Sequence, residues 1–318
     1  MGLNTEERQG VKYFTGYEVE HTICYGMYTL FVVGVQPVEE ILRIADDTQA
    51  MLDESKRIKQ IYFGTSQSFN PKSISHEEYK RWDDVIIGCL KADYWVTLGT
   101  TAESATLTRS EKTAILEFVI GNNTKKIPVV CGLGGNNTSE VINELESIDF
   151  TGVTAILSVS PYYNKPSQEG IIKHYSLIAD KAAVPVILYN VPGRTSSNLS
   201  DRTTIHLSKH PNIIGIKESS GNLEQCMRIL NECPKDFMMI SGDDMLTIPL
   251  MAVGGVGVIS VLANAYPTLF KKMTDFALAG EFKRAAAIQR KFAKLHPMMY
   301  EEGNPTGLKV TLNELKLA

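Results

Sequence analysis

The stretch Ile213-Ile214-Gly215-Ile216-Lys217-Glu218-Ser219-Ser220 decides the fold class of this 318-residue chain. Four apolar or glycine residues in a row predict a strand that is covered on both faces, as in a parallel sheet. A lysine in such a strand is costly to bury as a cation, so burial favours the free amine, which attacks carbonyl carbons. The stretch therefore predicts a buried strand with Lys217 as a candidate nucleophile, unless the lysine extends into solvent at the strand end.

Strand-like segments recur on both sides of this stretch and alternate with helical ones. The strand-like runs span residues 94–100, 127–132, 153–159, 185–189, 237–241 and 256–261, and the helical patterns span 110–120, 139–146, 170–181, 202–209 and 223–230. This alternation predicts right-handed βαβ units and a parallel sheet. A further strand at Lys59–Ser66 brings the total to eight, so we predict an α/β fold of the TIM (β/α)8 barrel type.

A doubly wound sheet is the alternative fold, because it has the same alternation. Such sheets carry a glycine-rich dinucleotide-binding turn after a strand. The turn Gly132-Leu133-Gly134-Gly135 lacks the third glycine of that fingerprint and the acidic residue one strand later. We therefore favour the barrel.

At each end of the chain, one segment lies outside the predicted barrel. The strand-like run Thr29–Val35 is one strand–helix unit too many, so residues 1–56 are predicted to be an atypical N-terminal βα extension of unknown role. The barrel would span residues 57–267. The pattern then turns wholly helical, which predicts C-terminal helices over residues 268–318.

Composition excludes several classes of protein. A net charge of −4 without any basic run argues against nucleic-acid and anionic-membrane partners. No apolar stretch reaches the roughly 18 residues of a membrane span, and the polar N-terminus does not resemble a signal peptide. The five cysteines form no C-x-x-C pair, which predicts reduced thiols and a cytoplasmic protein.

Hydroxyl, phenol and guanidinium side chains follow the predicted carboxyl ends of the strands, where TIM barrels carry their active sites. They are Thr100, Thr101, Tyr162, Tyr163, Tyr189 and Arg194, and Lys217 ends its own strand. Singly, threonines can cap helices and tyrosines can fill the core. Together they suit amine catalysis on a keto acid, with an imine-forming lysine, hydroxyls for a carboxylate, a proton-transferring phenol and an arginine for a second carboxylate.

Metal binding has little support. His206 and His210 lie four residues apart on a predicted helix, but the glutamate of the H-E-x-x-H motif is absent. A solvated helix face explains the pair more simply, so we predict no metal site.

Five motifs together resemble the dihydrodipicolinate synthase / N-acetylneuraminate lyase family of class I aldolases. They are GTTAES at 99–104, SPYYNKP at 160–166, YNVPGRT at 189–195, IGIKESSGN at 214–222 and GVISV at 257–261. Their order and spacing resemble the family from about Tyr94 to Lys309. The double threonine and Arg194 are similar to the dihydrodipicolinate synthase branch, whereas the sialate lyase branch typically lacks that arginine.

The resemblance implies catalytic roles for five residues. Lys217 would form a Schiff base with pyruvate, and Tyr189 would be the general acid/base beside it. Thr100 and Tyr163 would complete a proton relay. Tyr162 would reach into the neighbouring subunit's site, so a homodimer or homotetramer is implied.

The resemblance also implies substrates and binding residues. Thr101, Gly242 and Ile259 would line the pyruvate site, and Arg194 would bind the carboxylate of L-aspartate 4-semialdehyde. The implied reaction condenses these substrates to 4-hydroxy-tetrahydrodipicolinate in lysine and diaminopimelate biosynthesis, with no cofactor. The alternatives are a related pyruvate-dependent aldolase for a keto-deoxy sugar acid or sialate-type aldehyde, and a catalytically impaired fusion.

Both ends of the chain depart from the family pattern. The family opens its first strand within ten residues and ends it in a Thr-Pro-Phe-like turn, whereas Lys59–Ser66 continues into Gln67-Ser68-Phe69. Only thirteen residues follow Pro305, so we expect a shortened C-terminal helical segment.

The family's inhibitory lysine site is partly matched. Ser104, Ala105, Asn136, Glu140 and Tyr162 fall on positions that hold the inhibitor in inhibited members. Arg109 and Lys112 stand where such members often have histidines, and two added cations should repel a lysine ammonium. We therefore expect weak or no inhibition by lysine.

Overall fold

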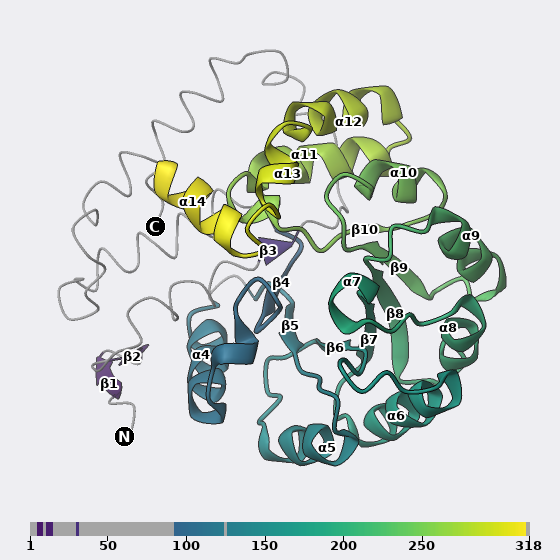
Figure 1. Ribbon diagram of the computed structural model, residues 1–318. Helices are drawn as coiled ribbons and strands as arrows, with labels where there is room; N and C mark the ends of the chain where they lie inside the picture. Colours follow the sequence, from purple (N-terminus) through teal and green to yellow (C-terminus); the bar gives the residue numbers. More distant parts are fainter. Residues whose placement is uncertain (1–4, 9–10, 15–29, 32–91, 124–125, 316–318) are drawn as a thin grey trace.

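The computed structural model describes residues 5–8, 11–14, 30–31, 92–123 and 126–315. In these ranges, parallel strands lie side by side in chain order and form a curled sheet (Figure 1). They are β4 (Tyr94–Thr97), β5 (Val129–Gly132), β6 (Ala155–Val159), β7 (Val186–Asn190), β8 (Ile213–Glu218), β9 (Met238–Ser241) and β10 (Gly257–Val258). All of them fall on predicted strands, which confirms the α/β fold with the parallel sheet expected of a TIM barrel.

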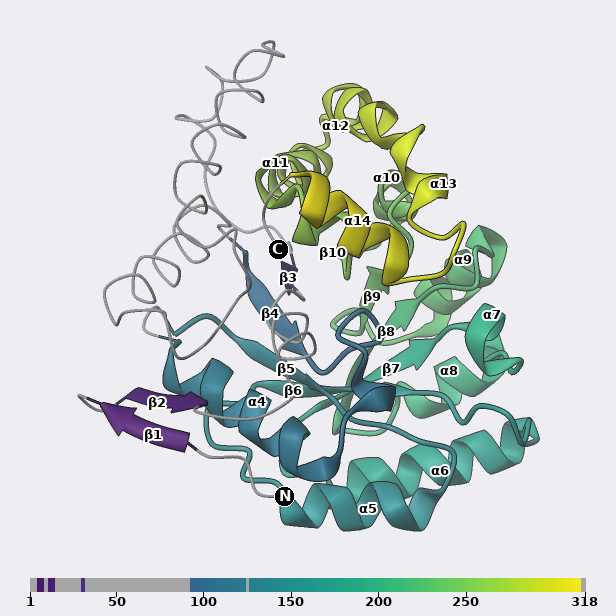
Figure 2. The same ribbon diagram turned by 60° about the vertical axis from the view of Figure 1, so that its left-hand side comes forward.

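Helices connect successive strands and cover the outside of the sheet (Figures 1 and 2). They are α4 (Arg109–Gly121), α5 (Thr138–Ser147), α6 (Gln168–Lys181), α8 (Asp201–Leu207), α9 (Leu223–Glu232) and α10 (Thr247–Ala252), with the short turns η2 (Ser104–Thr106), α7 (Pro192–Thr195) and η3 (Leu262–Asn264). Of the six longer helices, all but α10 begin at a polar residue whose side chain accepts hydrogen bonds from first-turn amides. These caps fix where each helix begins, and so fix the length of the loop before it.

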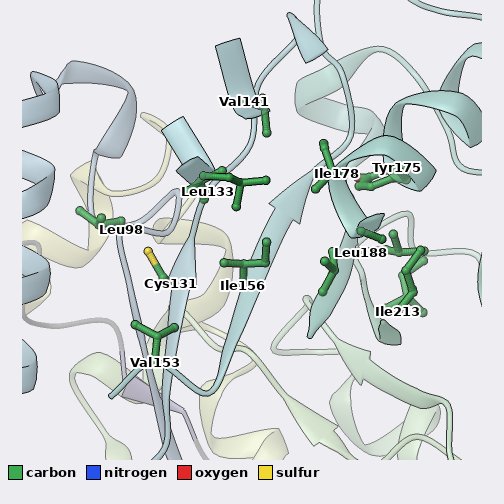
Figure 3. Close-up of a cluster of buried hydrophobic side chains, with 14 of the residues drawn as sticks. Leu98, Cys131, Leu133, Val141, Val153, Ile156, Tyr175, Ile178, Leu188 and Ile213 are labelled. Carbon is green, nitrogen blue, oxygen red and sulfur yellow. The ribbon is translucent and has the colours of Figure 1, made fainter. Parts of the chain in front are cut away.

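Side chains of the strands alternate between two apolar layers. Ile156 and Leu188 point outward and pack with Tyr175 and Ile178 of α6 (Figure 3). Residues at the intervening positions face the other way and form a separate inner cluster, which includes Tyr189. The inner face lies within the curl of the sheet, where the interior of a barrel is filled by side chains.

The pairing of β7 with β8 contains an irregularity that decides which side chains face inward. The register shifts between Val186 and Ile187, because β8 carries one extra residue there. An extra residue moves every later side chain to the opposite face of a strand. The shift places Lys217 opposite Tyr189, on the same inner face.

The C-terminal helices form a second packed unit beside β10 and α10 (Figure 2). They are α11 (Pro267–Leu278), α12 (Phe282–Gln289), η4 (Arg290–Phe292), α13 (Leu295–Met298) and α14 (Thr306–Glu314). Phe270 and Phe292 lie at its centre, with ring centroids 5.0 Å apart. The helical nature predicted for this region is confirmed.

Only short parts of the N-terminal region are described. β1 (Thr5–Arg8) pairs antiparallel with β2 (Val11–Phe14). β3 (Leu30–Phe31) pairs antiparallel with β4, at the sheet edge where the first barrel strand was predicted. Part of the predicted extension thus joins the sheet. The predicted strand Lys59–Ser66 lies outside the described residues.

No helix in the described ranges combines the length and the apolar character needed to cross a bilayer.

Candidate active site

Lys217 and Tyr189 stand side by side on the inner face of the sheet. They are paired in the register of β8 with β7, and Lys217 Nζ lies 4.3 Å from the centroid of the Tyr189 ring. Both are buried, with 9 % of the Lys217 surface exposed. The face of an aromatic ring attracts an ammonium group, which holds the lysine against the phenol. A proton-transferring group is therefore in contact with the candidate nucleophile.

The surroundings of Tyr189 lower the pKa of its phenol. Burial alone would raise the pKa of Tyr189, yet the net shift of that pKa is downward. The groups that lower it are the Lys217 charge, the nearby Thr100 and Ser219 hydroxyls and the Arg194 charge. Ser219 Oγ has no hydrogen bond of good geometry in the described part of the chain, so we attribute its effect to proximity. A phenol with a lowered pKa is suited to acid–base work.

A strained turn presents the two threonines. Leu98, directly after β4, has a φ of 58°, a left-handed conformation that costs a non-glycine residue about 1 kcal/mol. Ala102 N then donates to Gly99 O at 3.1 Å and closes the turn. Thr100 and Thr101 occupy its centre, at the carboxyl end of β4.

Gly242 lies directly against the Lys217 side chain. A Cβ at Gly242 would lie 1.9 Å from Ser219 Oγ and 2.9 Å from Lys217 Cε, so no larger residue fits without displacing the amine. Beside it, Ile259 is buried in the inner cluster, and its N–H donates to Ser241 O at 2.7 Å. These contacts place the end of β9 against the lysine and the end of β10 beside β9.

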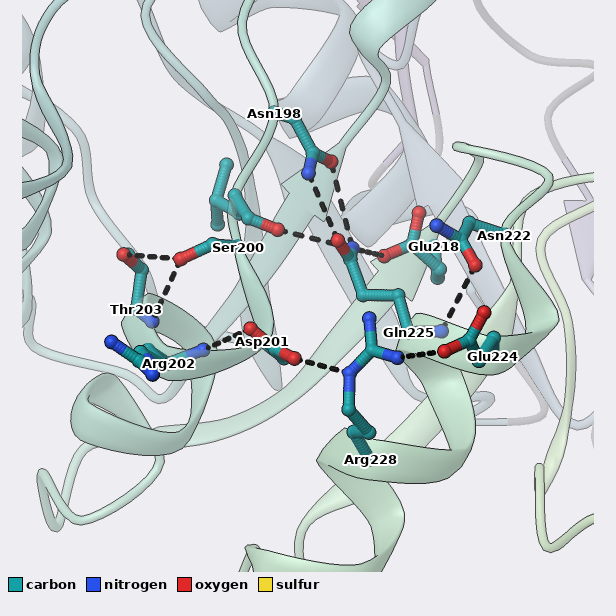
Figure 4. Close-up of polar contacts among 11 residues, drawn as sticks. Asn198, Ser200, Asp201, Arg202, Thr203, Glu218, Asn222, Glu224, Gln225 and Arg228 are labelled. Carbon is teal, nitrogen blue, oxygen red and sulfur yellow. Dashed lines mark hydrogen bonds and ion pairs between the residues drawn. The ribbon is translucent and has the colours of Figure 1, made fainter.

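A buried polar network surrounds Glu218, the residue after Lys217, and Figure 4 shows its part through Gln225 and Asn198. Asn190 Nδ2 donates to both carboxylate oxygens of Glu218, at 3.1 and 3.0 Å, and Ser220 N donates to one of them at 2.6 Å. Gln225 Nε2 of α9 donates to Glu218 at 3.3 Å, and Gln225 Oε1 accepts from Asn198. Burial raises the pKa of Glu218, and these hydrogen bonds oppose that rise. Because the network joins the residues that follow the phenol and the amine, it holds β7 and β8 in their register.

Arg194 and Thr101 are connected through the C-terminal segment. Arg194, on α7, is exposed, and its Nη2 donates to the main-chain carbonyl of Asn304 at 3.2 Å. The side chain of Asn304 donates from Nδ2 to Thr101 Oγ1 at 3.1 Å. The two predicted carboxylate-binding residues therefore contact one and the same asparagine.

No three His, Cys, Asp or Glu side chains in the described ranges group closely enough to hold a metal ion. His210 Nε2 lies 3.1 Å from Asp180 Oδ1, and His206 is exposed on α8. The absence of a metal from the reaction stays a prediction.

Comparison with known proteins decides the family. The sequence model of the dihydrodipicolinate synthetase family matches residues 83–318. This chain belongs to the dihydrodipicolinate synthetase family. The chain is 52 % identical over 220 residues to the 4-hydroxy-tetrahydrodipicolinate synthase of Cytophaga hutchinsonii, covering 69 % of this chain and 74 % of that relative.

Solved structures of the family have the same fold. The dihydrodipicolinate synthase of Aquifex aeolicus matches with a TM-score of 0.71 and 35 % identity, over 76 % of this chain and 83 % of that one. The chloride-inhibited dihydrodipicolinate synthase of Acinetobacter baumannii, solved with pyruvate, matches with a TM-score of 0.70 and 33 % identity, over 83 % of both chains. The family match begins at residue 83, and the predicted barrel boundary at residue 57 stays a prediction.

In this member of the dihydrodipicolinate synthetase family, most of the predicted site residues come together. The residues around the Lys217 amine are Thr100, Tyr189, Gly242 and Ile259. Thr101 and Arg194 lie at the mouth and are joined through the C-terminal segment.

Tyr162 and Tyr163 do not lie with these site residues within one chain. Tyr163 has 88 % of its surface exposed and Tyr162 has 41 %, and neither is among the groups that act on the Tyr189 phenol. Asn136 Nδ2 donates to Tyr162 O at 3.1 Å, so the loop is held while its rings face solvent. The predicted relay through Tyr163 is therefore not formed by this chain's own tyrosine.

The residues of the predicted lysine site lie around η2 and α5. Ser104 and Ala105 are in η2, and Glu140, on α5, pairs with Arg109 at 3.8 Å. Lys112 pairs with Glu144 at 3.5 Å. The two added cations are thus engaged by acidic side chains.

Two residues of this family member were missed by sequence reasoning. Ser219 lies two positions after Lys217, so the period of a strand could have placed it on the same face. Asn304 is separated from Thr101 by 203 residues, and no local pattern connects them.

Proposed function

We propose that this protein catalyses the condensation of pyruvate with L-aspartate 4-semialdehyde to 4-hydroxy-tetrahydrodipicolinate, in lysine and diaminopimelate biosynthesis. The observation that carries the proposal is the buried contact of Lys217 with Tyr189, at 4.3 Å, in a chain 52 % identical to a 4-hydroxy-tetrahydrodipicolinate synthase. The position of Arg194 at the mouth supports an aldehyde that carries a carboxylate.

Lys217 supplies the nucleophile. Its free amine attacks the keto carbon of pyruvate, and the resulting carbinolamine loses water to give an imine. The oxygen that leaves must be protonated, and the Tyr189 phenol is the neighbouring acid. The Thr101 hydroxyl holds the pyruvate carboxylate, and Ile259 and Gly242 line the pocket.

The protonated imine then acts as an electron sink. The pyruvate methyl group loses a proton, the electron pair moves toward the imine nitrogen, and an enamine forms. The lowered pKa of Tyr189 makes its phenolate available as the base. Thr100, whose hydroxyl acts on the phenol, passes the proton onward.

The enamine carbon attacks the aldehyde while Arg194 binds the carboxylate of that second substrate. The aldehyde oxygen takes a proton and becomes the hydroxyl group of the product. The amino group of the aldehyde substrate next attacks the imine carbon, releases the Lys217 amine and closes the ring. One water leaves overall, during imine formation, so no oxidant or reductant is needed.

A second copy of the chain completes the relay in this proposal. The exposure of Tyr162 and Tyr163 supports it, because a tyrosine loop held outward by Asn136 can enter a neighbouring site. We infer a homo-oligomer whose subunits exchange these rings, working in the cytoplasm.

Removing the Arg194 charge tests the choice of aldehyde. In the Arg194→Ala variant, we expect KM for aspartate semialdehyde to rise by about 100-fold, because a charge-assisted carboxylate contact is lost. Pyruvate imine formation should persist, since Lys217 is untouched. The matched control is Arg202→Ala, which removes an exposed arginine of α8.

Steady-state kinetics with both substrates and borohydride trapping give the two readouts. An Arg194→Ala enzyme with an unchanged KM for aspartate semialdehyde would favour a different aldehyde. Loss of both readouts in Arg202→Ala as well would point to a folding defect.

Lysine feedback is expected to be weak. Glu140, a predicted contact for the inhibitor, is paired with Arg109, and Lys112 adds a second positive charge nearby. A lysine ammonium would have to displace Arg109 from the Glu140 carboxylate. The inhibition constant for L-lysine should therefore exceed the millimolar range in a steady-state assay, and a sub-millimolar constant would contradict this.

A further inference from the structure

Asn304 lies between the two residues that the proposed function assigns to substrate carboxylates. Its Nδ2 donates to Thr101 Oγ1 at 3.1 Å, and its main-chain carbonyl accepts from Arg194 Nη2 at 3.2 Å. Nearby, Lys309 Nζ pairs with Glu103 at 2.7 Å. These contacts tie Asn304 and the first turn of α14 to the loops that follow β4 and β7.

The contact with Thr101 leaves its single hydroxyl proton available for another acceptor. An amide nitrogen has no acceptor, so Thr101 Oγ1 accepts the hydrogen bond and its own proton stays available. The opposite side of the amide, Asn304 Oδ1, is buried without a hydrogen-bond partner in the described part of the chain. The reverse amide orientation would consume the threonine proton and leave a carboxylate at the site without that donor.

The contact with Arg194 uses a neutral acceptor. A main-chain carbonyl fixes one nitrogen of the guanidinium and leaves its charge uncompensated. Within the described ranges, no ion pair joins Arg194 to an acidic side chain. The positive charge of Arg194 therefore stays available to an anion that enters the site.

We propose that Asn304 is a positioning residue for both substrate carboxylates. Its amide nitrogen directs the Thr101 proton into the pyruvate site, and its carbonyl holds the Arg194 guanidinium at the aldehyde site. The Lys309–Glu103 pair fastens the segment that carries it. This inference rests on the proposed function.

The Asn304→Asp substitution tests the proton direction with almost no change of shape. The new carboxylate accepts the Thr101 proton and repels the pyruvate carboxylate, so we expect the apparent KM for pyruvate to rise by about ten-fold or more. Asn304→Ala only frees the hydroxyl to rotate, so the rise should be a few-fold. In both variants kcat at saturating substrates should change less than KM.

Two further variants separate positioning from stability. Lys309→Gln loosens the segment and should raise both KM values slightly, in the same direction. Asn212→Asp alters a structural asparagine just before the amino-terminal end of β8, at the other end of that strand from Lys217, whose Nδ2 donates to Ala179 O and Ala182 O. It should lower the melting temperature without changing either KM.

Each variant is measured by steady-state kinetics and by the pyruvate concentration that gives half-maximal borohydride trapping on Lys217. An unchanged pyruvate dependence in Asn304→Asp and Asn304→Ala would overturn the inference. So would equal KM changes in Asn212→Asp, which would mark a general structural effect. If the unmodified protein itself gives no Lys217 adduct, the proposed function fails instead.

Discussion

The Lys217 side chain has room in the site because Gly242 has no Cβ atom. A Cβ at that position would overlap Ser219 Oγ and approach Lys217 Cε to 2.9 Å. Real Cβ atoms do not come so close to other heavy atoms, so both the serine hydroxyl and the lysine side chain must move. The position of the Lys217 amine therefore depends on the absence of a side chain at Gly242.

The Gly242→Ala variant should remain folded and lose imine formation by at least about ten-fold, because a misplacement near 1 Å removes reactive geometry. The measurement is the rate of borohydride trapping with pyruvate. Gly121→Ala is the matched control, since a Cβ there meets nothing within 4 Å at the end of α4. Equal trapping rates in the two variants would show that the lysine does not depend on this space.

The sequence predicted those site residues that lie in local motifs. Lys217, Tyr189 and Thr100 stand at strand ends, in motifs that the amino-acid sequence alone displays. Their mutual contact depends on the extra residue in β8, which a run of four apolar or glycine residues does not reveal. Asn304 could not be predicted, because its contact with Thr101 arises from tertiary packing across 203 residues.

At the scale of elements, helix α6 carries a buried histidine against α5. His174 Nδ1 lies 2.8 Å from Thr138 Oγ1, and its Nε2 is buried without a partner in the described part of the chain. Burial lowers the pKa of His174 to about 4, from an ordinary value of 6.5. The imidazole is therefore neutral in the folded protein near neutral pH.

The depressed pKa predicts a loss of stability in mild acid. Below pH 6.5 the unfolded chain binds a proton that folded His174 binds only near pH 4, so stability present above pH 6.5 is lost as the pH falls. The loss is up to about 3 kcal/mol.

Urea unfolding of wild type and His174→Gln at pH 7.5 and pH 5 measures it. The variant should show a smaller difference between the two pH values, and exposed His206→Gln should behave as wild type. An equal pH dependence in wild type and His174→Gln would contradict the assignment.

Element boundaries followed from the sequence wherever the pattern was regular. Predicted strands such as Ile213–Lys217 and helices such as Gly170–Lys181 agree with β8 and α6 within two residues. β10 is shorter than the predicted run 256–261, because the Val261 and Leu262 amides donate to the Asp244 carboxylate and the chain continues into η3. β3 pairs antiparallel in the sheet rather than outside it, a tertiary contact that strand propensity does not specify.

At the scale of the whole molecule, the exposed tyrosine loop predicts an assembly that shares residues between sites. If Tyr163 acts from a second copy, a Lys217→Ala chain can supply its tyrosine to a Tyr163→Phe chain that still has the lysine. In a 1:1 mixture of dimers, half are mixed and each has one complete site, so about a quarter of the sites are restored.

Refolding the two inactive variants together, followed by an activity assay, measures this complementation. Sedimentation of each variant alone provides the control for assembly. Activity that stays at the level of the two separate variants would show that the relay does not cross between subunits.

The measurement that tests the imine mechanism most directly is borohydride reduction of the protein with pyruvate, followed by peptide mass mapping. We predict one reduced pyruvyl adduct, on Lys217, because that amine lies buried against the Tyr189 phenol. Lys272, which is also buried but lies on α11, should remain unmodified. No adduct in a protein that unfolds cooperatively, or an adduct on another lysine, would contradict the imine mechanism.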